Sequence, residues 1–596
     1  MKRYLILMAA SALAISSCGW LDKLPESDLS PETYFRNETD LKLFSNPLYN
    51  NLLDDNVYGH QDDQILNKTL SDVLQGGSAR TVPQSGGGWS WSNLTRINIL
   101  LGNIDNCADE AARLKYTGVA KFFRAYFYFD KVKRFGDVPW IDHELTSDDP
   151  LLYAPRDNRE VILTHMIEDI DEAIQYLPET EENPYRLTKW AALALKSRFC
   201  LHEGTFRKYH SGRMEFQGND AEYYLNLAAE ASREIMDSGR YHLYSTGNPD
   251  EDYVRLFAKE NADPNEYILA RCYNRGVAVM HDASTYPVMA SHGKAGFSKK
   301  MVDSYLMRDG SRFTDKEGWA TMEYADEVAG RDPRLAQTMR TPTYKMLDAR
   351  IMSPVNFEQT VTGFQTIKFV MSSTAEAAHL SGDQSTNDLP IFRYAEVLLN
   401  YAEAKAELGT LTQTDLNESI KLIRDRVGMP NLDKDAANAN PDLNYILNPQ
   451  YGYSNITGPN AGVIGEIRRE RNIELAQEGT RRMDDLMRWR EGKCIDQPMY
   501  GFYFSRIGTF DFNEDGVFDL YIYQDGKEDK SIKATVKLKL GVDIYLTDME
   551  NERGYVDPFQ NIAHSFNEDR DYFYPIPYGE IDKNKNLGQN PGWSNN

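Results

Sequence analysis

The segment 511–519, DFNEDGVFD, is the first place where residue types and spacing suggest chemistry. Four oxygen-bearing side chains occupy calcium-loop positions there: Asp511, Asn513, Asp515 and Asp519. Gly516 allows the sharp turn that such a loop needs, but Ile522 stands where a calcium loop has a bidentate Glu. No flanking helices are expected either. The segment therefore predicts a β-turn between two strands, with a structural calcium site as the alternative.

Paired carboxylates raise the question of an enzyme. Asp62 and Asp63 are adjacent acids, whereas the acid and base of a glycosidase lie about 5 to 10 Å apart across a sugar. The sequence contains no GxSxG, HExxH or phosphate-binding loop. We therefore expect no enzyme and no cofactor, and keep a glycoside hydrolase as an alternative.

The N-terminus carries an export signal. Lys2 and Arg3 precede a short apolar run at 5–15, and two serines precede Cys18. Cleavage before Cys18 is similar to bacterial lipoprotein processing, in which this cysteine takes the lipid. An ordinary signal peptide with an accidental cysteine is the alternative. The other cysteines lack CxxC spacing and are expected to be small buried residues, without a disulfide framework or zinc site.

The composition and net charge of the chain limit the classes of partner that it is expected to bind. The chain has 596 residues, 41% of them hydrophobic, and includes 36 Tyr and 25 Phe, which suffices for a large core. Its 66 basic and 90 acidic residues give a net charge of −24. This charge disfavours nucleic acid and an anionic membrane surface as partners.

Helical periodicity dominates the pattern, and the segment 393–409, RYAEVLLNYAEAKAELG, shows it best. Its apolar residues form one stripe, and four polar residues on the opposite face are expected to contact solvent: Glu396, Asn400, Glu403 and Glu407. One helical hairpin cannot bury its own stripe, so others should stack against it. The sequence predicts four pairs that resemble tetratricopeptide repeats, near 115–176, 188–237, 393–426 and 464–490.

Between and around these pairs lie long irregular regions. They are near 45–93, 240–390 and 491–560, with isolated strands expected at 266–272, 517–523 and 531–545. Loops this long usually serve a function, so a loop-rich, partly β face should carry the binding surface of one domain spanning 19–596. The Arg-rich stretch 467–490 has glutamates at four-residue spacing, which favours ion pairs within the helix as a structural network.

Several segments match a known family in the expected order. They are LDKLPESDLS after Cys18, WSNLTRINILLGNID at 91–105, FFRAYFYFDKVKRFGDVPWI at 122–141, RLTKWAALALKSRFCLHEG at 186–204, DPRL at 332–335, LPIFRYAEVLLNYAEAKAELG at 389–409, IRRERNIELAQEGTRRMDDLMRW at 467–489 and YFYPIPYGEIDKNKNLGQNPGW at 572–593. With these segments the chain resembles the SusD/RagB family of outer-membrane nutrient-binding lipoproteins of Bacteroidetes.

The resemblance implies a mostly α-helical fold with four tetratricopeptide-like pairs. It also implies a lipid-anchored protein on the outer surface of the outer membrane, monomeric when isolated. Such a protein captures glycan and passes it to a SusC-like TonB-dependent transporter, on which it sits as a lid. A lid or docking subunit for peptide or another nutrient is the alternative function.

The resemblance also directs attention to exposed aromatic residues on loops, because the apolar face of a sugar ring stacks on Trp or Tyr. Trp89 follows three glycines outside any helix pattern and is the first candidate. Trp91 begins a helix, so core packing is favoured over ligand contact. Tyr286, Trp319 and Tyr324 lie in the central irregular region and are the next candidates. We expect at least one of these five residues to contact the ligand.

Overall fold

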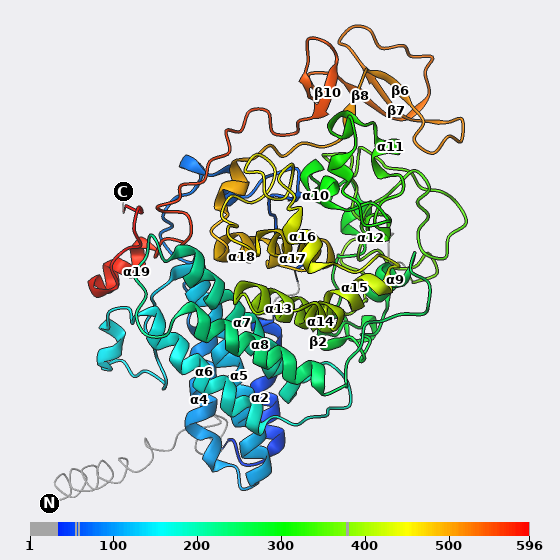
Figure 1. Cartoon of the computed structure of the whole chain (residues 1–596). Coiled ribbons are helices and arrows are strands. Elements are labelled where there is room, and N and C mark those ends of the chain that lie inside the picture. The colour runs from blue at the N-terminus through cyan, green and yellow to red at the C-terminus, as the bar shows by residue number, and fades with distance from the viewer. Residues whose placement is uncertain (1–33, 54–55, 58–59, 377–380, 595–596) are drawn as a thin grey trace, which may run out of the picture.

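A helical body forms most of the molecule, and the strands of residues 503–556 lie at one end of it. The computed structural model describes residues 34–53, 56–57, 60–376 and 381–594. Figure 1 shows α2 (Glu38–Leu52) and α4 (Ser92–Asn103) at the opposite end of the molecule from the sheet that contains β7 (Phe518–Tyr523). The predicted class, mostly α with a partly β region, is confirmed.

Helices form in all four of the segments near which pairs are predicted. They are α5 (Glu110–Phe135) with α6 (Arg159–Tyr176), α7 (Lys189–His210) with α8 (Ala221–Asp237), α13 (Tyr394–Glu407) with the short α14 (Gln413–Asn417) and α15 (Ile420–Arg426), and α17 (Ala461–Glu474) with α18 (Arg481–Arg488). Side-chain caps fix where several begin: Asp109 accepts from the N–H of Ala112 in α5, and Thr188 from that of Ala191 in α7.

The expectation that α13 has one face in solvent is wrong. Its four polar residues are buried, with Asn400 and Glu403 each only 1% exposed. The helix packs against α7 and α8 and also against α17, so neighbours cover both of its faces, and Figure 1 shows it in the middle of the molecule. Its carboxylates remain charged partners: Glu403 accepts from both terminal nitrogens of Arg488, and Glu407 accepts from Lys208 at 2.7 Å. Ion pairs thus replace the expected solvent.

The glutamates of the Arg-rich stretch form a structural network, but most of their ion pairs run between elements. Glu474 lies 2.7 Å from Arg393 and 3.1 Å from Arg334. Glu478 pairs with Lys368 at 2.6 Å and also with Arg393. The expected pairing within the helix holds for Glu466, which lies 3.4 Å from Arg469, and is wrong for Glu470, Glu474 and Glu478. These buried pairs join α17 and the turn after it to the central part of the chain.

The sheets are small and mostly antiparallel. The strand pairings are β1 (Ile65–Leu66) with β3 (Gly296–Phe297), β2 (Tyr267–Arg271) with β4 (Leu389–Arg393), β7 between β6 (Gly508–Phe510) and β8 (Ala534–Lys539), and β10 (Arg553–Val556) between β5 (Tyr503–Phe504) and β9 (Leu546–Asp548). The strands predicted at 266–272 and 517–523 are confirmed. In the segment 531–545 only Ala534–Lys539 is a strand.

The segment 511–519 forms the turn between β6 and β7, as the β-turn interpretation predicts. One carboxylate oxygen of Asp511 accepts from the N–H of Gly516 at 2.8 Å, and Asp519 accepts from the N–H of Phe512 at 2.7 Å. Asn513 and Asp515 bond to each other at 3.0 Å. Across the described ranges, no three Asp, Glu, His or Cys side chains are grouped to hold a metal ion. These oxygens close the turn by bonding to its backbone N–H groups and to each other.

The structure bears on two further predictions, the state of the cysteines and the presence of membrane-spanning helices. Cys107, Cys200 and Cys494 are buried free thiols, as predicted, and Cys272 is an exposed one. Cys18 lies outside the described residues. Among the helices that the structure describes, none combines the length and the apolar character needed to cross a bilayer.

Candidate functional site

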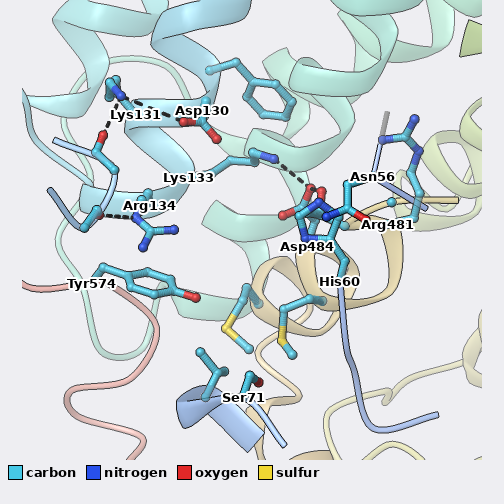
Figure 2. Close-up of a pocket in the computed structure, with 18 of the residues that line it drawn as sticks. Asn56, His60, Ser71, Asp130, Lys131, Lys133, Arg134, Arg481, Asp484 and Tyr574 are labelled. Carbon is cyan, nitrogen blue, oxygen red and sulfur yellow. Dashed lines mark hydrogen bonds and ion pairs between the residues drawn. The ribbon is translucent and has the colours of Figure 1, made fainter. Parts of the chain in front are cut away.

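A cleft of about 990 Å³ opens among the described residues, and Figure 2 shows it. We call it the cleft. Most of its wall comes from residues 50–93, the second half of α5, the turn 478–480 with the start of α18, and the C-terminal segment 571–593; α7 adds Arg198 and His202. The predicted binding region 45–93 therefore contributes, whereas 240–390 adds only Pro390 and 491–560 adds nothing.

The wall supplied by α5 is basic. Lys131 donates from Nζ to the carbonyl of Gly88 at 2.6 Å, and Arg134 donates from Nε to the carbonyl of Gly87 at 2.7 Å (Figure 2). The guanidinium of Arg134 lies 3.7 Å from the ring centroid of Tyr574, a cation–π contact. Burial lowers the pKa of Lys131, and the charge of Arg134 lowers it further. Two cations are thus held side by side on carbonyl oxygens.

Other charged groups of the cleft are paired within the protein. Lys133 donates to Asp484 at 2.7 Å, and Asp484 also accepts from the hydroxyl of Thr480 (Figure 2). Of the two adjacent acids considered in the sequence, Asp62 lines the cleft, and Asp63 pairs with Arg482 at 2.8 Å. Burial, followed by repulsion from Asp63, raises the pKa of Asp62 to about 7. Because Asp63 is engaged by Arg482, the two acids do not form the separated pair of a glycosidase.

The expected exposure of Trp89 is wrong. Its side chain is only 8% exposed and packs edge-on against Phe135, 4.9 Å between ring centroids, and against Trp91 at 5.3 Å. The glycines that precede it adopt positive φ, and the N–H of Trp89 bonds back to Gly86 at 2.8 Å. The tight turn directs the indole into the core under α5.

Three other predicted ligand contacts are also packed against the core, to different degrees: Trp91, Tyr324 and Tyr286. Trp91 is half-buried, with its ring 5.6 Å from that of Phe127, as core packing predicts. Tyr324 is 4% exposed, stacks on Phe502 at 4.2 Å and donates its hydroxyl to a backbone carbonyl. Tyr286 is half-buried. Of the five candidates, the structure brings together only Trp89 and Trp91.

Trp319 lies in a second hollow, of about 880 Å³. Besides Trp319, this hollow is lined mainly by charged and polar residues: Arg312, Thr314, Asp315, Lys316, Glu317, Asn440 and Asn444. We call it the Trp319 hollow. The indole is half-buried, and it meets Tyr445 at 5.6 Å and Tyr451 at 5.8 Å, edge to face in both cases. An aromatic ring beside carboxylates, amides and cations is suited to a ligand with both apolar C–H faces and hydroxyl groups.

The sequence patterns missed the cleft residues outside the loops. Lys131 and Arg134 belong to an aromatic-rich helix, and Tyr574 belongs to the segment 572–593, which contributed only to the family resemblance. The signal that was available is the cluster of three basic residues within four positions at 131–134, just after the phenylalanines of α5.

Comparison with known proteins identifies the family. A family model described as the SusD family matches residues 265–593, more than half of the chain. The chain belongs to the SusD family. A second model, described as starch-binding associating with outer membrane, matches residues 89–201.

Other SusD-family proteins are similar over most of the chain. SusD-like protein P2 of Formosa agariphila is 23% identical over 435 residues, which cover 69% of this chain and 78% of that protein. The crystal structure of a SusD-like protein from Bacteroides fragilis shares the fold with a TM-score of 0.67 and 21% identity, covering 96% of this chain and all of the other. A SusD-like carbohydrate binding protein of the same organism has a TM-score of 0.66 and 22% identity, with coverage of 93% and 100%.

Proposed function

We propose that this SusD-family protein is a non-catalytic glycan-binding lipoprotein of the outer membrane. It captures oligo- or polysaccharide at the cell surface and delivers it to a SusC-like TonB-dependent transporter. Two similarities support this proposal: one solved relative from Bacteroides fragilis is a SusD-like carbohydrate binding protein, and the family model that matches residues 89–201 is described as starch-binding associating with outer membrane. The export signal that ends at Cys18 supports the lipid anchor.

The observation that carries the proposal is the Trp319 hollow. Trp319 offers a half-buried indole, and the side chains around it can donate to and accept from sugar hydroxyls. Asn440 and Asn444 each provide both a donor and an acceptor, and Asp315 provides acceptors. Trp89 and Tyr324 are less suitable stacking platforms because both are packed in the core.

The experiment is binding of residues 19–596 to a panel of neutral and acidic polysaccharides, by affinity electrophoresis and then calorimetry. We expect binding to at least one class without new reducing ends. Trp319→Ala should weaken this binding by roughly tenfold or more, since it removes about 1.5–3 kcal/mol of aromatic burial.

The matched control is Tyr153→Ala, which removes an aromatic side chain that is 62% exposed elsewhere on the surface. It should leave affinity unchanged. Absence of binding to every glycan would favour the lid or docking subunit for peptide or another nutrient. Release of sugar products would overturn both and favour the glycoside hydrolase.

A further inference from the structure

Two cations of the basic wall, Lys131 and Arg134, lack a close carboxylate among the described residues, whereas Lys133 is paired with Asp484. The nearest carboxylate contact that the structure gives Lys131 is Asp130 at 4.0 Å, and in the described part of the chain Arg134 has no ion pair. Instead, Lys131 donates to the carbonyl of Gly88 and Arg134 donates to that of Gly87. A Cβ on Gly88 would lie 2.6 Å from Nε of Arg134, so only glycine permits this close approach. The chain as a whole carries a net charge of −24, so a positive wall is contrary to its average surface.

A third cation adds to this end of the cleft. The guanidinium of Arg80 lies 4.9 Å from the ring of Tyr574, which Arg134 also contacts at 3.7 Å. Arg80 is only 5% exposed, and its Nη2 has no hydrogen-bond partner within the described residues. The carboxylate beside it, Asp571, is shared with Arg570 at 2.6 Å. Nη1 of Arg80 is already engaged by Asp571 at 3.0 Å, so Nη2 is the donor that is left for a ligand oxygen in the cleft.

The surroundings of these cations suit a sugar. The lining also includes amides and hydroxyls, such as Asn51, Asn93 and Ser71, which match sugar hydroxyl groups. The acids Asp72 and Asp130 also line the cleft and would repel a peptide with consecutive negative charges. A volume of about 990 Å³ is in the range of ligand-binding clefts. An oligosaccharide that carries separated carboxylates fits this mixture better than an acidic protein segment.

We propose that the cleft binds uronate-bearing glycan, with one carboxylate of the ligand held by Lys131 and Arg134 and approached by Arg80. This site is separate in its lining residues from the Trp319 hollow. The inference rests on the proposed function, because it names the glycan class that a SusD-family glycan-binding protein takes. A bidentate guanidinium–carboxylate contact supplies the selectivity for the charged sugar.

The test compares three acidic polysaccharides, polygalacturonate, alginate and glucuronoxylan, with their carboxyl-reduced forms, using residues 19–596. We expect at least one acidic form to bind more tightly than its reduced form, and to lose affinity as salt rises from about 50 to 500 mM. Lys131→Gln and Arg134→Gln should each weaken that binding roughly tenfold, and Arg134→Lys should weaken it less. The matched control is Lys196→Gln. It removes a cation of α7 that lies outside the cleft and pairs with Asp171 of α6.

The possible results separate this inference from the proposed function. Equal binding of acidic and reduced glycans, or full affinity of folded Lys131→Gln and Arg134→Gln, would overturn the carboxylate site while leaving glycan capture at Trp319 intact. Binding of poly-glutamate but of no uronate would assign the cleft to an acidic protein segment. Absence of binding to every glycan would remove the proposed function together with this inference. Circular dichroism and melting temperature verify that each variant is folded.

Discussion

Glu396 is the buried carboxylate whose removal best tests the role of ion pairs in this fold. It lies on α13 and is 3% exposed. Both of its oxygens accept from Arg198 of α7, from Nε and from Nη2, each at 2.7 Å, and Arg481 of α18 lies 3.8 Å away. The substitution Glu396→Gln keeps the size of the side chain and removes its charge.

The magnitude follows from the titration of this carboxyl group. Burial opposes its ionisation, but Arg198 and Arg481 more than offset the burial and lower its pKa from 4.5 to about 2. A difference of about 2.5 units corresponds to about 3 kcal/mol of folding free energy at neutral pH. For the partner Arg198, burial and then the charge of Arg481 outweigh the attraction of Glu396, so the pKa of Arg198 is lowered. The predicted loss of folding free energy follows from the carboxylate, because Glu396→Gln leaves the buried Arg198 without its counter-charge.

The pH dependence has a definite sign. The folded pKa of Glu396 lies below the unfolded value, so the unfolded chain binds more protons between about pH 2 and 4.5. The stabilisation is therefore complete above about pH 4.5 and is lost as pH falls towards 2. The stability difference between the original protein and Glu396→Gln should shrink over this interval.

The assay is urea unfolding, followed by circular dichroism and tryptophan fluorescence, at several pH values. Glu234→Gln is the matched control: Glu234 pairs with Lys189 at 2.8 Å, but its side chain is 48% exposed, so the loss should be below about 1 kcal/mol. A loss for Glu396→Gln as small as the control's, or a difference that is constant with pH, would refute the reasoning.

Two further substitutions separate core, anchor and ligand roles. Tyr324→Ala should lower the free energy of unfolding by about 3–5 kcal/mol, because Tyr324 packs on Phe502 in the core. The glycan affinity of the folded variant should stay unchanged. A loss of affinity without a loss of stability would instead show that Tyr324 contacts the ligand. Cys18→Ala should move the protein from the membrane fraction to the soluble fraction without changing its melting temperature, as fractionation and a thermal melt can measure; persistence in the membrane fraction would contradict the lipid anchor.

The helix pairs could be predicted because their periodicity is local. Apolar residues three and four apart mark one face of a helix wherever the helix lies. Burial of the opposite face is not local: the partners of Glu396 and Glu403 are Arg198 and Arg488, 198 and 85 residues away in the chain. No pattern within α13 distinguishes a glutamate that contacts solvent from one that meets such a partner.

The candidate site was predicted less well, for a related reason. A run of glycines before Trp89 indicates an exposed loop, yet the same glycines permit the turn that buries the indole beside Phe135. Lys131 and Arg134 resemble the polar end of an ordinary helix. Their role depends on Gly87 and Gly88, more than 40 residues earlier, and on Tyr574 near the C-terminus.

The buried ion pairs and the cleft are parts of one arrangement. Arg198 on α7 and Arg481 on α18 both line the cleft, and Glu396 lies between them on α13. One buried carboxylate thus fixes two helices that shape the wall of the cleft. Because removing either side of such a pair strands a buried charge, the helices have few alternative positions. The cleft is therefore supported by a rigid set of helices, and this rigidity keeps the cations of α5 in place for a ligand.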